Sequence, residues 1–73
     1  MHEKVKAQAR LIYEKYQTLL LDKHQTCQVL NMSIRTLENL RKDCKAPEEL
    51  RADGGKVLFE IHDLSGWIEA NKS

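Results

Sequence analysis

Four polar side chains recur on one side of a short predicted helix that follows Ser33: Arg35, Thr36, Asn39 and Lys42. Residues three and four positions apart lie on one face of an α-helix, so these side chains share a surface. In the DNA major groove, a guanidinium can donate two hydrogen bonds to guanine, and an amide can pair with adenine. The threonine suits thymine or phosphate, and the lysine suits phosphate. This face therefore predicts contact with double-stranded DNA.

The alternative is that this face is only the solvated side of a surface helix, because the solvent side of any amphipathic helix is polar. The elements around the face help to choose between the two interpretations. Asp22 is a good N-cap for a first short helix, and Asn31 can end that helix because asparagine tolerates the left-handed backbone. Ser33 then caps a second helix whose inward residues are Leu37 and Leu40. Two short helices joined in this way are typical of a helix-turn-helix, which reads DNA with its second helix.

A hairpin is predicted between Leu50 and Phe59, where Asp53-Gly54-Gly55-Lys56 separates a short extended arm from a β-prone run. Arg51 and Lys56 flank its tip, and Lys45 lies between the second helix and the hairpin. All three cations suit phosphate groups. A hairpin that projects beside a DNA-reading helix is a wing. The alternative is a hairpin that only connects its neighbours.

From Leu20 to Ile68 the chain resembles the small winged-helix proteins that include phage excisionases, AlpA-type regulators and the DNA-binding domains of MerR-like regulators. No single motif is specific, and the resemblance depends on the joint order and spacing of many short ones. The matching residues are Leu20-Leu21, Asp22, Thr26-Cys27, Val29-Leu30-Asn31-Met32-Ser33, Thr36-Leu37, Arg41-Lys42, Pro47, Gly54-Gly55-Lys56 and Asp63-Leu64 followed by Trp67-Ile68.

The resemblance implies a mainly α fold with a small β-hairpin wing, a winged helix-turn-helix preceded by an extra N-terminal amphipathic helix. It also implies binding of double-stranded DNA. The residues it implicates are Ser33, Arg35, Thr36, Asn39, Arg41 and Lys42 on the recognition helix, and Lys45, Arg51 and Lys56 at phosphates and in the wing. The chain departs from the family at Glu38, which either accepts a hydrogen bond from cytosine or points away from DNA. Asn31 and Cys44 stand where glycines are expected.

Length and charge fit one compact domain, with an N-terminal helix over residues 1–19 and the DNA-binding unit over 20–73. Twelve basic and eleven acidic residues give a net charge of +1, so the affinity of one copy for DNA is expected to be modest. Several copies on adjacent repeats, or a partner protein such as an integrase, would compensate. Excision control and transcriptional regulation both remain open. The competing function is a protein-interaction module that has lost DNA binding.

Two further helices are predicted outside the helix-turn-helix. The first runs from His2 to Leu19, and its apolar stripe packs either on the domain's own core or on a second copy. The second carries Ile61, Leu64, Trp67 and Ile68, is opened by His62-Asp63 and ends at Asn71. The tryptophan is expected in the core, with an exposed anchor for a partner protein as the alternative.

Cys27 and Cys44 are expected to be free thiols in a cytoplasmic protein, because neither a secretion signal nor a membrane-length apolar run is present. A zinc site could be imagined from these two cysteines with His24 and His62, but the spacing typical of zinc sites is missing. Neither metal nor cofactor is expected. No phosphate-binding loop or nucleophile context is present, so neither catalysis nor a small-molecule substrate is predicted.

Overall fold

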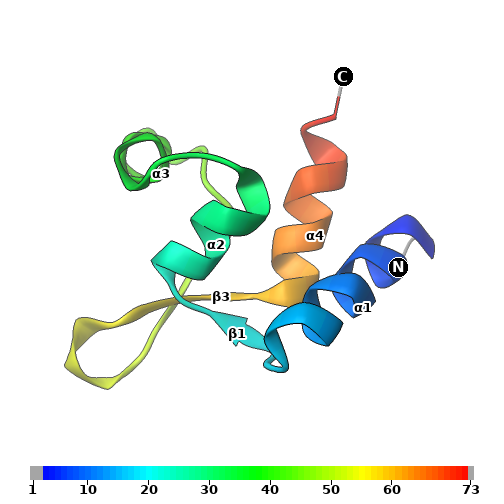
Figure 1. The fold of residues 1–73 in the computed structure, drawn as a ribbon. Helices are drawn as coiled ribbons and strands as arrows, with labels where there is room; N and C mark the ends of the chain where they lie inside the picture. Colours follow the sequence, from blue (N-terminus) through cyan, green and yellow to red (C-terminus); the bar gives the residue numbers. More distant parts are fainter. Residues whose placement is uncertain (1–2, 73) are drawn as a thin grey trace.

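The structure, a computed structural model, describes residues 3–72 and is mainly helical with a small antiparallel sheet (Figure 1). This confirms the predicted mixture of helices and a hairpin. The strand order is β1-β3-β2, so the last strand in the sequence is the central one. The elements are α1 (Glu3–Tyr16), β1 (Leu20–Leu21), α2 (Lys23–Leu30), α3 (Ile34–Lys42), β2 (Leu50–Arg51), the 3-10 turn η1 (Asp53–Gly55), β3 (Val57–Glu60) and α4 (Ile61–Ala70).

The predicted start and end of α2 and the predicted start of α3 are confirmed by their caps. The Asp22 carboxylate accepts a hydrogen bond from the Gln25 N–H at 2.8 Å, and the Gln25 side chain accepts one from the Asp22 N–H at 3.0 Å. Asn31 ends α2 in the left-handed conformation, with φ 56° and ψ 48°. The Ser33 hydroxyl accepts from the Thr36 N–H at 3.1 Å and so begins α3.

The helix predicted to end at Leu19 ends earlier, and a strand that was not predicted follows it. Gln17 takes φ 57°, and its N–H donates to the Tyr13 carbonyl at 2.7 Å, which closes α1. The chain then runs as β1, where Leu20 pairs with Glu60 and Leu21 with Phe59 of β3. An extended backbone is favoured here because it lets Leu21 reach the core. His2, the predicted first residue of this helix, lies outside the described residues.

Two apolar clusters form the core, and paired residues of β1 and β3 join them. One cluster contains Ala9, Ile12, Leu21, Ile61 and Leu64, and the other contains Cys27, Leu37, Val57 and Phe59. The apolar stripe of α1 therefore packs on the domain's own core, as the first of the two predicted alternatives states. In α3, Leu37 is fully buried and Leu40 is half-buried, which agrees with their predicted inward positions.

The C-terminal helix α4 begins one residue earlier than predicted, because Glu60 rather than His62-Asp63 supplies its N-cap. The Glu60 carboxylate accepts from the His62 N–H. Trp67 is half-buried, and its indole N–H donates to the Lys45 carbonyl at 2.9 Å. Its ring is thus neither wholly in the core nor a free anchor. It ties α4 to the segment that follows α3.

The backbone at Cys44 leads to a first prediction. Cys44 is exposed and has φ 57°, and the adjacent Lys45 N–H donates back to the Leu40 carbonyl at 2.8 Å, as at glycine-terminated helices. A β-carbon is strained in this conformation. We expect Cys44→Gly to raise the free energy of unfolding by about 0.5–1 kcal/mol, measured by chemical denaturation. Cys44→Ala keeps the β-carbon and should change it little. A glycine variant less stable than the alanine variant would contradict this account.

Candidate nucleic-acid interface

The exposed face of α3 carries the four side chains with which the sequence analysis began. Arg35, Thr36, Asn39 and Lys42 are all exposed, while Leu37 faces the core between them. In Figure 1, α3 and the yellow loop of the β2–β3 hairpin lie at the left, and α1 and α4 lie at the right. One side of the molecule therefore combines α3 with a projecting hairpin.

The N-terminal end of this face is organised by the cap of α3. The Ser33 and Thr36 hydroxyls lie 3.0 Å apart, in addition to the bond between the Thr36 N–H and the Ser33 oxygen. Ser33, a predicted site residue, thus holds the first turn of the helix. Thr36 remains exposed, so its methyl group is open to an approaching molecule. The cap fixes where Arg35 leaves the backbone at the start of the polar face.

The hairpin is built as its glycines predict. Leu50 pairs with Leu58 and Arg51 with Val57, and the Ala52 N–H donates to the Lys56 carbonyl at 2.8 Å. Gly54 and Gly55 both have φ 80°, a conformation that costs glycine little. The cations Arg51 and Lys56 are exposed here, as predicted, but so is Asp53. The tip therefore carries charges of both signs.

Arg41, predicted as a DNA contact, is engaged inside the protein. Its side chain is only 16% exposed. Its Nε and Nη2 donate to the two oxygens of Glu49 at 2.7 and 3.0 Å, and its Nη1 donates to Glu38 at 2.6 Å. These hydrogen bonds raise the pKa of Arg41, with the pair to Glu49 contributing most. A guanidinium held in this way acts as a structural link and is not a free donor for phosphate.

The carboxylate of Glu38 is drawn toward protein cations. It accepts from Arg41 and lies 3.5 Å from the Lys23 ammonium of α2, so it links α2 and α3. The hydrogen bond from Arg41 is the main reason that the pKa of Glu38 is below its ordinary value. Both contacts hold the carboxylate of Glu38 within the protein.

Four cations of α3, the connection after it and the hairpin take part in no ion pair among residues 3–72. They are Arg35, Lys42, Lys45 and Lys56, and all four are exposed. Arg51 is 71% exposed and is only loosely paired, at 3.6 Å from Glu49. The acids on α3 and before β2 are thus partly neutralised by Arg41, while the outward cations stay available.

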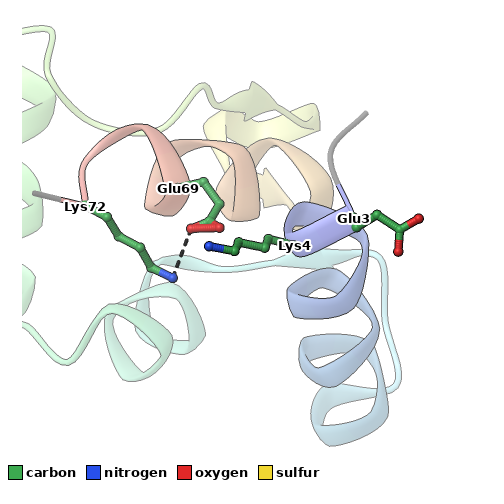
Figure 2. Close-up of a pocket in the computed structure, with 4 residues that line it drawn as sticks. All are labelled: Glu3, Lys4, Glu69 and Lys72. Carbon is green, nitrogen blue, oxygen red and sulfur yellow. Dashed lines mark ion pairs between the residues drawn. The ribbon is translucent and has the colours of Figure 1, made fainter.

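One hollow of about 360 Å³ lies on α3, lined by Glu38, Asn39, Arg41 and Lys42, and another lies on a different part of the molecule. Figure 2 shows this second hollow, of about 550 Å³, between the beginning of α1 and the end of α4, lined by Glu3, Lys4, Glu69 and Lys72. Its Glu69 and Lys72 pair with each other at 2.9 Å, and this hydrogen bond holds the pKa of Glu69 below its ordinary value. The second hollow is lined by residues of α1 and of the end of α4, so it does not extend the α3 and hairpin surface.

The cysteines are unbonded in the described part of the chain. Cys27 is buried in the second cluster. The pKa of its thiol is raised, mainly by burial and to a smaller extent by the negative charge of the nearby Glu38. Among residues 3–72, no group of three or more histidine, cysteine, aspartate or glutamate side chains is close enough to hold a metal ion. Over the same residues, no helix is both long and apolar enough to cross a bilayer.

Comparison of the sequence with models of known protein families found no match, and neither did comparison with curated proteins.

One important residue of this surface was missed by the sequence analysis. The sequence analysis gave Glu49 no role, yet it is the main partner of Arg41. The pair of Glu38 and Arg41 could have been expected, because residues at i and i+3 on a helix are neighbours. Glu49 lies beyond the end of α3, so no helical periodicity points to it.

The ion pairs around Arg41 lead to a second prediction. The hydrogen bonds from Arg41 hold the pKa values of Glu49 and Glu38 below their ordinary value of 4.5. A carboxyl whose pKa is lowered by folding stabilises the folded state above its unfolded pKa and loses that contribution as the pH falls through its folded pKa. We therefore expect the free energy of unfolding to decrease as the pH is lowered below about 4.5, measured by denaturation over a pH series. In Arg41→Met the slope should be shallower, and an equal slope in both proteins would contradict this assignment.

Proposed function

We propose that this protein is a winged helix-turn-helix that binds double-stranded DNA in a sequence-specific manner, in the cytoplasm. In this proposal α3 is the recognition helix in the major groove, and the β2–β3 hairpin is the wing. The observation that carries it is the exposed polar face of α3, whose side chains suit base edges, on a helix that lies on the same side of the molecule as a projecting hairpin with two exposed cations. The capped α2–turn–α3 unit supports it further, because the turn fixes the angle at which α3 is presented.

Each exposed residue has a role in this proposal. Arg35 donates two hydrogen bonds to guanine, Asn39 pairs with adenine, and the Thr36 methyl contacts thymine. Ser33 acts through the cap. The phosphate contacts are made by cations from three segments, the end of α3, the connection after it and the hairpin: Lys42, Lys45, Arg51 and Lys56.

The energetics favour action in more than one copy. Two good base contacts provide about 2–6 kcal/mol of discrimination, whereas useful specificity in a genome needs roughly 4–10 kcal/mol. We therefore propose binding of several copies to adjacent repeats, or binding beside a partner such as an integrase. The resemblance to excisionases and small regulators makes control of phage or mobile-element excision, or of transcription, the biological setting. Binding of equal strength to a single half-site and to repeats would contradict the cooperative form.

A second candidate function is a protein-interaction module on the same scaffold. The observation that favours it is the exposure of large apolar side chains away from the core, with Leu11 65%, Leu19 56% and Leu50 50% exposed. Large apolar side chains that stay exposed provide contact area for a partner protein. In this function the polar face of α3 would be solvated surface and would make no contact with bases.

The test is a titration of the protein into a pool of double-stranded DNA that includes its genomic neighbourhood. Four phosphate contacts predict a slope of about −3.6 for log K against log salt, measured between about 50 and 200 mM. Lys42→Met should reduce the steepness of this slope by about 1, because it removes one phosphate contact. Absence of binding at low salt would favour the interaction module.

Substitution of Arg35 separates reading of bases from attraction to phosphates. Arg35→Ala should cost about 1–3 kcal/mol on the selected sequence and much less on unrelated DNA, measured by competition binding. Arg10→Ala on α1 is the matched control, since it removes the same charge from an exposed site on another helix. Equal losses in the two variants would argue against base recognition by α3.

A further inference from the structure

A chain of alternating charges runs from α2 through α3 to the hairpin. Lys23 lies 3.5 Å from Glu38, which is bonded to Arg41 at 2.6 Å. Arg41 is bonded to Glu49 at 2.7 Å, and Glu49 lies 3.6 Å from Arg51 of β2. The chain thus connects the elements that carry the two parts of the candidate interface, although they are separate in the sequence.

The central pair of this chain has the geometry of a firm link. Two donors of the planar Arg41 guanidinium meet the two oxygens of the Glu49 carboxylate, an arrangement that fixes orientation as well as distance. Both groups are largely covered, with the arginine side chain 16% and the glutamate side chain 24% exposed. Glu49 immediately precedes β2, so its position determines where the hairpin starts relative to α3.

We infer that Glu49 and Arg41 are positioning residues for DNA recognition, which hold the hairpin at the angle to α3 that lets Arg51 and Lys56 reach phosphate while α3 lies in the groove. This inference rests on the proposed function. Two binding elements held rigidly act at high effective concentration for each other, whereas a loose hairpin loses that advantage. Arg51 is the outermost member of the chain, and its long contact to Glu49 leaves it free to turn toward a phosphate.

The direction in which Glu49→Gln changes the affinity for DNA distinguishes this positioning role from simple electrostatics. Glu49→Gln removes a negative charge beside the proposed DNA surface, so electrostatics alone predicts tighter binding. The positioning role predicts weaker binding, because a neutral amide cannot hold the guanidinium as the carboxylate does. Glu48→Gln is the matched control, since Glu48 is adjacent and exposed and takes part in no ion pair among residues 3–72.

The experiment measures the affinity of the full chain for its selected DNA in these two variants. We expect Glu49→Gln to bind about 3- to 10-fold more weakly than wild type, and Glu48→Gln to bind equally or more tightly. In a background with Arg51→Gln and Lys56→Gln, the loss caused by Glu49→Gln should vanish, because the hairpin then has no cations to position. Binding of Glu49→Gln as tight as that of Glu48→Gln, or a loss that persists without the hairpin cations, would overturn the inference.

A measurement without DNA separates this inference from the proposed function. The Ala52 N–H is bonded to the Lys56 carbonyl inside the hairpin loop, so its hydrogen exchange reports how firmly the hairpin is held. Glu49→Gln should speed this exchange by about threefold or more, while Glu48→Gln should not. If wild type binds no DNA but this difference appears, the link to the hairpin stands and the proposed function falls. If the difference is absent, the link itself is overturned.

Discussion

The packing of Phe59 in the middle of the sheet is the contact on which the rest of this small protein depends. A chain of 73 residues can bury only a limited core, so each fully buried side chain must serve several elements. Phe59 packs with Cys27 of α2 and Leu37 of α3, and its strand partner Leu21 belongs to the cluster formed with α1 and α4. The same strand β3 is one arm of the hairpin. The orientation of α3 and the origin of the hairpin are therefore both set by one strand.

Because that core reaches only the inner side of α3, its outer edge depends on polar contacts. Arg41 uses two acids, Glu38 and Glu49, whose charges would otherwise face the same side as the outward cations. The near-neutral net charge is thus a poor guide to this surface. Acids that are paired internally repel an approaching polyanion less than free ones do, whereas Lys42 and Lys45 are exposed and form no ion pair among residues 3–72. The distribution of pairs, more than the net charge of +1, decides what this side of the molecule can bind.

The features that were predicted from the sequence are local ones. Asp22, Asn31 and Ser33 act on backbone groups within three or four residues, so their identity was enough to place both ends of the turn. The glycines placed the hairpin in the same way. Strand β1 was missed because two leucines form a strand here only by pairing with a segment about 40 residues later. Arg41 was assigned to DNA because its type and position suit phosphate, while its actual partner, Glu49, is fixed by tertiary structure.

The modest positive charge also bears on how such a surface could achieve specificity. Attraction to phosphate is the same for every sequence, so a protein with few outward cations gains little from non-specific DNA. Asp53 at the hairpin tip lowers this general attraction further, next to Lys56. Under the proposed function, what remains must come from side chains that distinguish bases, and Arg35 and Asn39 are exposed on α3. On this view weak general affinity favours discrimination, because it leaves most of the binding free energy to the contacts that differ between sequences.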